Sequence, residues 1–191
     1  MHPRFFTRFG NEGAVGSYIL VITLSSPVNL VFGRFRNGAP IFMDRGEYLY
    51  IGSALGGTRS HSPLAARLIR HASRSGGQKP HLIRKALIGL FPDYEDSVKK
   101  SPGMAQKKLR WHIDYLLDLP AAEIRHMVII HSPKRLEREL WKLLEPQEEI
   151  SVPAHRLGAQ DTRECTHLLR TEDIEQVLGT IRKSVPEMIM S

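Results

Sequence analysis

The stretch Glu47-Tyr48-Leu49-Tyr50-Ile51-Gly52-Ser53 combines tyrosine, leucine and isoleucine in the manner of a β-strand. It follows Asp44-Arg45-Gly46, whose residue types favour a turn. The stretch therefore predicts a strand over Glu47–Ser53. Because side chains alternate along a strand, Tyr48 and Tyr50 would lie on the same face of the sheet.

Two further strands are predicted upstream of this stretch. Gly16–Leu24 is rich in β-favouring residues and ends at Ser25-Ser26-Pro27. Asn29–Phe35 predicts a second strand, which the hairpin signal Asn37-Gly38 ends, and Ile41–Met43 would extend that hairpin. Together with the stretch above, these segments predict an antiparallel meander and a three-stranded sheet.

The remaining segments mostly predict helices. Helical signals cover Pro63–Ser73, His81–Leu90, Trp111–Leu117, Pro133–Glu145 and Ile174–Val185, and His126–Ile130 is a candidate strand. Ser62-Pro63 and Ser132-Pro133 each combine a capping residue with a proline at the first helical position. We therefore predict an α/β fold, with a small, mainly antiparallel three-stranded sheet flanked by helices.

Composition excludes several classes of protein. The chain has 191 residues, a one-domain length, and 41% hydrophobic residues are enough for a real core. No apolar stretch approaches the roughly 18 residues of a membrane helix, and the N-terminus lacks the apolar core of a secretory signal. One cysteine, Cys165, excludes an internal disulfide and a zinc site built on several thiolates. We expect a soluble, cytoplasmic protein.

Positive charge is concentrated in one third of the chain. Residues 59–111 contain 12 Lys and Arg against 3 Asp and Glu, within a net charge of +7 for the whole chain. Such a block suits contacts with the phosphates of a nucleic acid. A merely solvated basic surface would give the same composition, so charge alone does not identify the partner.

Two tyrosines on neighbouring strands form the first candidate site. Tyr18 follows Gly16-Ser17, and Tyr50 lies in the stretch described above. On a small sheet the two phenols would point to a common place. Tyrosines also occur in strands for packing alone, and that alternative stays open.

The helix after the Gly-rich loop at residues 55–61 adds a second candidate. Arg67 and His71 are four residues apart and share one helix face, and Arg70 and Arg74 form an adjacent ridge. An arginine stabilises negative charge that develops on a phosphate as it is cleaved, and a histidine transfers a proton or binds the phosphate. The alternative is an ordinary basic helix face with a solvated histidine.

A carboxylate interrupts an apolar helix stripe and forms the third candidate. On the predicted helix after Pro133, Glu137 falls between Leu144 and Trp141, within a stripe of leucines. Burying a carboxylate there is costly unless a cation or strong hydrogen-bond donors compensate its charge. A divalent metal would do so, since Mg²⁺ commonly uses one or two protein carboxylates with water and substrate oxygens. A salt bridge to a nearby arginine would do so equally.

Two polar segments are possible accessories. His112 and Asp114 lie in Trp111-His112-Ile113-Asp114-Tyr115, which a packed helix explains equally well. Residues 158–168 contain Gln160, Asp161 and His167, and place amide, carboxylate and imidazole groups together on a predicted loop.

In the order of these signals, the chain resembles the GIY-YIG nuclease superfamily. There a Gly-x-Tyr motif comes first, followed by Tyr-Ile-Gly, then by a helix with Arg and His, and finally by a helix with Glu. The likeness is closer to its small prokaryotic Uri-type branch and covers roughly residues 16–170. The segments that carry it are Glu47–Ala54, Arg70-His71, Trp111–Leu117 and Gly158–Leu168. Such relatives usually have cysteines where this chain has Arg138, Thr162 and Glu164, so no thiol role is carried over.

The resemblance implies a role for each matched residue. Tyr18 and Tyr50 would lie in the active site, where one of them would help to activate water. Arg67 would stabilise the transition state, and His71 would transfer a proton or contact phosphate. Glu137 would bind one Mg²⁺ or Mn²⁺. The implied reaction is the hydrolysis of a phosphodiester bond in DNA, and RNA as a substrate stays open. The basic residues expected to contact the nucleic acid are Arg59, Arg70, Arg74, Lys79, Arg84 and Lys85.

The chain is expected to divide into three segments. Residues 1–14 are expected to be a flexible arm, residues 15–172 the GIY-YIG-like domain with a basic insertion at about 75–106, and residues 173–191 a terminal helix. Two other functions remain open: a catalytically weak nucleic-acid-binding module with this fold, and a regulatory subunit that directs a partner enzyme.

Overall fold

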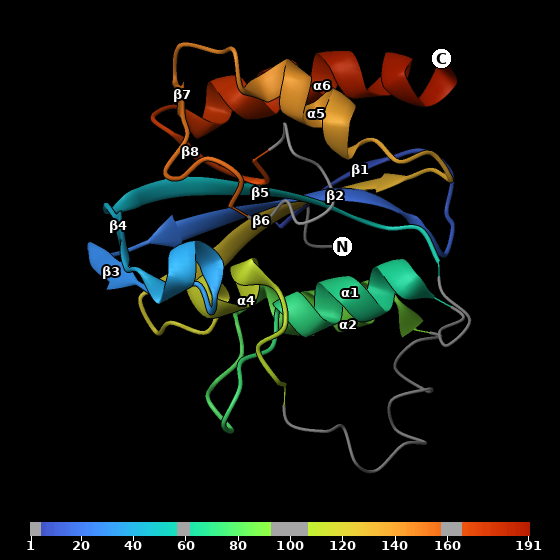
Figure 1. Cartoon of the computed structure of the whole chain (residues 1–191). Helices are drawn as coiled ribbons and strands as arrows, with labels where there is room; N and C mark the ends of the chain where they lie inside the picture. The colour runs from blue at the N-terminus through green and yellow to red at the C-terminus, as the bar shows by residue number, and fades with distance from the viewer. Residues whose placement is uncertain (1–4, 57–61, 93–106, 158–165) are drawn as a thin grey trace.

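The computed structural model describes residues 5–56, 62–92, 107–157 and 166–191 (Figure 1). Its elements, in chain order, are β1 (Phe6–Phe9), β2 (Gly16–Leu24), β3 (Val28–Leu30), η1 (Phe35–Gly38), β4 (Ile41–Met43), β5 (Gly46–Ala54), α1 (Pro63–His71), α2 (Ile83–Leu90), α4 (His112–Leu117), β6 (Ala122–His131), α5 (Glu137–Leu144), β7 (Ile150–Ser151), β8 (Leu168–Thr171) and α6 (Ile174–Met190). No helix in these ranges is long and apolar enough to cross a membrane.

The main sheet has six strands in the order β1-β6-β2-β5-β8-β7. β1 pairs with β6 in parallel, and every other neighbouring pair is antiparallel. The α/β class and the mainly antiparallel sheet are therefore confirmed, although the sheet is larger than the three strands predicted. The long strands β2 and β5 form its centre with β6.

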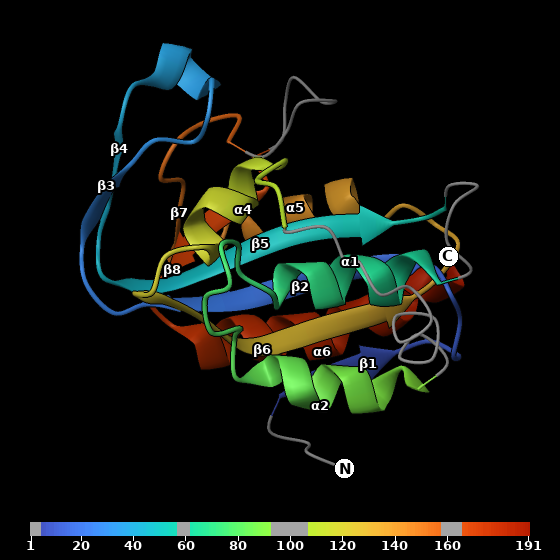
Figure 2. The ribbon, with the colours of Figure 1, turned by 90° about the horizontal axis from the view of Figure 1, so that it is seen from below.

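Helices cover both faces of this sheet, as Figures 1 and 2 show. α1, α2 and α4 pack on one face, where the core includes Leu20 and Ile22 of β2. α5 and α6 pack on the other face, where the core includes Ile19 and Val21. Successive β2 side chains thus enter different cores, which explains why this strand is apolar almost throughout.

The predicted meander is wrong in one respect, because β3 and β4 form their own two-stranded sheet. Together with η1 they make a hairpin arm, residues 28–43, which projects from one end of β2 and β5 (Figure 2). The strand predicted over Asn29–Phe35 ends at Leu30. Val31 and Phe42 of the arm are exposed. The turn Asn37-Gly38 was recognised, but a local turn signal does not specify which sheet its strands join.

The N-terminal segment predicted as a flexible arm contains a strand in its middle. Phe6–Phe9 form β1, which pairs with Met127–Ile130 of β6. β8 was not predicted either, and it pairs with Glu47–Tyr50 of β5. Both strands have only four residues, which is too short for periodicity to show in the sequence.

α5 begins four residues later than predicted. The Ser132 hydroxyl accepts a hydrogen bond from the Lys134 N–H, so it closes a local turn rather than capping a helix at Pro133. Glu137 is consequently the first helical residue. The helix predicted over His81–Leu90, within the proposed insertion, is present as α2, and its Ile83 and Leu87 are fully buried in the core. Residues 93–106 lie outside the described ranges.

Candidate functional site

Tyr18 and Tyr50 lie together on the face of the sheet that α1 covers. Their ring centroids are 6.4 Å apart, on the neighbouring strands β2 and β5. Gly52 pairs with Tyr18 across the strands, and a Cβ at Gly52 would stand 2.5 Å from the Tyr18 hydroxyl. Only glycine at this position leaves room for the phenol. The pairing of the two tyrosines, predicted from strand geometry, is present in the structure.

His71 joins the tyrosine pair from the end of α1 and is completely buried. Its Nε2 lies 2.9 Å from the Tyr18 hydroxyl oxygen. Burial lowers the pKa of His71 well below its usual value, and the charges of Arg67 and Lys107 lower it further. Burial also raises the pKa of Tyr18 well above its usual value, and Tyr50 adds to this effect. With His71 neutral and Tyr18 protonated, the Tyr18 hydroxyl can donate this hydrogen bond to His71 Nε2.

Trp111 holds the arginine predicted to stabilise charge. The guanidinium carbon of Arg67 lies 4.1 Å from the centroid of the Trp111 ring, and the His71 ring lies 5.8 Å from the same centroid. The positive charge of Arg67 opposes the rise in the pKa of both Tyr18 and Tyr50, so it acts on both phenols. Trp111 belongs to a segment that carries the resemblance, but no role at the site was predicted for it from the sequence. Its role depends on a contact between α4 and α1 that no local pattern reveals.

Glu137 approaches the tyrosines from α5, on the other face of the sheet. Its negative charge contributes to the raised pKa of Tyr18 and of Tyr50, which places the carboxylate within electrostatic reach of both. The side chain is 17% exposed, and one oxygen lies 3.6 Å from the mostly exposed Arg135 guanidinium. The salt bridge considered above is thus present, but an exposed pair of this kind contributes little energy. The carboxylate keeps access to solvent.

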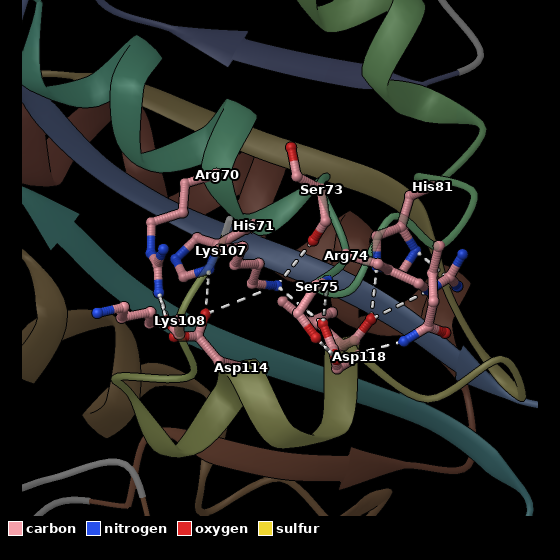
Figure 3. Close-up of polar contacts among 12 residues, drawn as sticks. Arg70, His71, Ser73, Arg74, Ser75, His81, Lys107, Lys108, Asp114 and Asp118 are labelled. Carbon is pink, nitrogen blue, oxygen red and sulfur yellow. Dashed lines mark hydrogen bonds and ion pairs between the residues drawn. The ribbon is translucent and has the colours of Figure 1, made fainter. Parts of the chain in front are cut away.

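Asp114 fixes the cationic groups around His71 (Figure 3). One buried oxygen accepts hydrogen bonds from the Arg70 guanidinium at 2.7 Å and from the backbone N–H groups of Arg110 and Trp111. Its other oxygen lies 3.9 Å from His71 Nδ1 and 3.8 Å from Lys107 Nζ. Asp114, predicted as an accessory, therefore acts as a positioning residue for α4 and α1. The buried Lys107 was not predicted, because it lies in a segment without readable periodicity.

Arg74 and His81 form a separate, structural network on the same side of the sheet (Figure 3). Arg74 is almost completely buried and donates to the backbone carbonyls of Leu117, Lys79 and Ala122. Its donors are used within the protein, which corrects the prediction that Arg74 contacts nucleic acid. His81 accepts from the Ile124 N–H and donates from Nε2 to Leu117, as a neutral ring.

The other predicted residues are more dispersed. Arg70 is held by Asp114 and by the Lys108 carbonyl, and Arg84 donates to the Ser73 hydroxyl. Lys79 and Lys85 are exposed. The His167 ring lies 6.4 Å from Tyr50, so it borders the site, whereas His112 is on the side of α4 that faces Phe35. Arg59, Gln160 and Asp161 lie outside the described residues.

Few side chains near the two tyrosines could bind a metal ion. In the described part of the chain, no three His, Cys, Asp or Glu residues gather into a metal-binding cluster. Glu137 offers one accessible carboxylate beside the two phenols. That arrangement fits a hard divalent cation, which fills its remaining positions with water and phosphate oxygens. It does not fit a metal held by the protein alone.

Comparison with known proteins gives one match. No curated protein and no solved structure matches the chain. A family model described as "Domain of unknown function DUF123" matches residues 17–190, which include both tyrosines, α1 and Glu137. The match covers most of the chain, and the protein therefore belongs to the DUF123 family.

Proposed function

We propose that this protein is a metal-dependent endonuclease of the GIY-YIG type, Uri-type branch, which hydrolyses phosphodiester bonds in DNA. The observation that carries the proposal is the hydrogen bond between the Tyr18 hydroxyl and a neutral, buried His71, with Tyr50 and Arg67 beside it. Packing alone does not require a cation, two phenols and an imidazole to converge at one place. The resemblance in motif order and the DUF123 match are consistent with it.

The tyrosines and His71 would handle the proton of the attacking water. Tyr50 keeps some exposed area whereas Tyr18 has none, so Tyr50 would contact the water and orient it. As the water oxygen bonds to phosphorus, its proton moves to the Tyr18 oxygen, and the Tyr18 proton passes to His71 Nε2. The bond from phosphorus to the leaving oxygen then breaks, and that oxygen takes up a proton from solvent.

Arg67 and Glu137 would manage the charge of the phosphate. Negative charge develops on the phosphate oxygens during attack, and the Arg67 guanidinium, fixed on Trp111, would offset it. Glu137 would hold one Mg²⁺ or Mn²⁺ by an accessible carboxylate oxygen. A bound divalent metal would supply charge neutralisation at the phosphate and at the leaving oxygen.

A cleavage assay tests the proposal. Purified protein is incubated with supercoiled and branched DNA in the presence of Mg²⁺, Mn²⁺ or a chelator. Arg67→Ala and Glu137→Ala should each abolish cleavage that requires metal. The matched controls are Arg182→Ala on α6 and Glu139→Ala on α5, both exposed, which should retain it.

The alternative function makes a different prediction in the same assay. A nucleic-acid-binding module would show salt-sensitive binding and no cleavage of any substrate, with metal or without. That result would contradict the endonuclease. Cleavage that persists in chelator, or in both variants, would also contradict it.

A further inference from the structure

The hairpin arm and α4 enclose a pocket of about 860 Å³ that lies outside the tyrosine site. Its walls come from the arm at Phe32–Arg36, from α4 and its N-terminal flank, and from residues 155 and 156 of the chain before β8. We call it the arginine pocket after four of the residues that line it: Arg34, Arg36, Arg110 and Arg156.

Within the described part of the chain, no carboxylate offsets the positive charge of this pocket. All four arginines are exposed, and none forms an ion pair with a carboxylate among the residues that the structure describes. None of the described lining residues is acidic. Four guanidinium groups around one cavity, without a carboxylate partner among the described residues, repel each other and favour the entry of an anion. The planar guanidinium group of arginine is suited to bidentate hydrogen bonds with phosphate oxygens.

Aromatic rings supply a second kind of contact in the pocket. The rings of Phe35 and His112 pack edge to face with centroids 5.2 Å apart, and Tyr115 lines the same cavity. The Arg36 guanidinium lies 5.7 Å from the Phe35 centroid. Burial lowers the pKa of His112, so its ring is neutral near pH 7. Aromatic rings interleaved with arginines are the usual surface on which unpaired bases stack.

The backbone is strained at two of the arginines. Arg36 has a φ of 48° and Arg156 a φ of 68°, in the left-handed region that residues with a side chain rarely adopt. Such strain is typical of binding sites, where it aims a side chain. The arm is also tied to α4, because Gly33 packs so closely on Tyr115 that a Cβ would stand 2.8 Å from the tyrosine hydroxyl. The pocket walls are therefore held in place.

The arginine pocket adjoins the tyrosine site through Trp111. The Arg110 guanidinium, which lines the pocket, lies 5.6 Å from the Trp111 ring centroid. The same ring contacts Arg67 and His71 of the tyrosine site. A strand with its scissile phosphate at Arg67 would thus pass into the pocket within the distance of a nucleotide or two.

We propose that the arginine pocket binds an unpaired nucleotide of the nucleic acid, with its phosphates against the arginines and its base against Phe35 and His112. As a statement about the substrate, this rests on the proposed function. It assigns the enzyme to nucleic acids that offer a single-stranded segment next to the cleaved bond. Uninterrupted duplex would then be a poor ligand, because its paired bases cannot enter.

Binding without catalysis tests the pocket directly. Fluorescence anisotropy in chelator measures the affinity of the full-length protein for a labelled ten-residue thymidine oligonucleotide and for a duplex of equal length. Phe35→Leu should weaken single-strand binding about tenfold, the loss of one stacked base. Arg110→Gln should lower the slope of log K against log salt by about 0.7, the loss of one phosphate contact. Arg182→Gln on α6, an exposed arginine far from the pocket, is the matched control.

An oligonucleotide with abasic central positions distinguishes contacts with the base from contacts with the phosphates. Wild-type protein should bind it about tenfold more weakly than oligothymidine, and Phe35→Leu should lose that difference. The affinities for single-stranded DNA and RNA of one sequence are compared in parallel to show whether the pocket prefers deoxyribose or ribose. Three results would overturn the proposal for the pocket. They are equal affinity for abasic and normal strands, tighter binding to duplex, and an equal decrease of the salt slope in Arg110→Gln and Arg182→Gln. Because no cleavage is measured, these results do not depend on the endonuclease proposal.

Discussion

At the scale of single residues, Gly52 makes the tyrosine site possible. The Tyr18 ring passes directly over its Cα, where any side chain would collide with the phenol. The Tyr-Ile-Gly triplet is therefore a steric requirement: Tyr50 supplies a phenol, and two residues later Gly52 admits the other one from the neighbouring strand.

Gly52→Ala should destabilise the protein by about 1–3 kcal/mol, because the new methyl group overpacks a rigid core. It should also displace Tyr18 from His71 and reduce activity. The control is Gly179→Ala in α6, where a Cβ meets nothing within 4 Å. That change should stabilise the helix by up to about 1 kcal/mol. Urea unfolding of both variants measures the difference, and equal effects would refute the steric explanation.

Stability should fall as the pH is lowered through the range in which His81 titrates. Burial, assisted by Arg74, lowers the pKa of His81 to about 4, whereas the unfolded chain binds this proton near pH 6.5. Between these values the unfolded state holds more protons, so the free energy of unfolding decreases by about 1.4 kcal/mol per pH unit from this group. His71 shifts in the same direction.

Urea unfolding at pH 7.0 and pH 5.5 measures this slope. His81→Gln keeps a donor for the Leu117 carbonyl but does not titrate, so the variant should lose less stability than wild type on acidification. An identical pH dependence in the two proteins would show that His81 is not the titrating group.

At the scale of elements, the N-terminus of α4 links the core to the site. Asp114 accepts the N–H groups of Arg110 and Trp111 in the first turn and also fixes Arg70 on α1. Asp114→Asn should therefore destabilise the protein by about 2–3 kcal/mol, the range for hydrogen bonds to a buried charged group. The control is Asp173→Asn at the N-cap of α6, where asparagine caps equally well and stability should barely change. Thermal unfolding of the two variants checks the contrast, and equal melting temperatures would contradict it.

The elements also show what the sequence specifies locally. The bounds of β2 were predicted correctly and those of β5 within one residue, because a fully buried strand has a continuous signature and a clear turn at its end. β1 and β8 could not be predicted, since their pairing comes from β6 and β5. The hydroxyl of Ser132 was assigned to a helix cap, but it serves a turn instead. The two missed strands depend on partners distant in sequence, whereas at Ser132 a local turn competes with the helix cap.

At the scale of the whole molecule, the candidate site draws residues from both faces of the sheet. Tyr18 and Tyr50 lie on the face of the sheet that α1 covers, and His71 is the last residue of α1. Glu137 is on α5, which packs on the opposite face (Figure 1). These four residues were predicted from the sequence, and the structure brings Tyr18, Tyr50 and His71 together. The sequence could not predict that the Arg74 guanidinium donates its hydrogen bonds to internal carbonyls, nor that the hairpin arm places Arg36 near α4. Both depend on the three-dimensional path of the chain.

The central claim is that the Tyr18–His71 pair takes the proton of the attacking water. It is tested most directly by the single-turnover rate of metal-dependent DNA cleavage in Tyr18→Phe and Tyr48→Phe. Tyr48 is an equally buried tyrosine on β5, but its hydroxyl donates to the Asp44 carbonyl, away from His71. Tyr18→Phe should lower the rate by about 10²–10⁴, the range for loss of proton transfer, while Tyr48→Phe should leave it within a few-fold of wild type. Equal rates in the two variants, or no metal-dependent cleavage by the wild-type protein, would contradict the account.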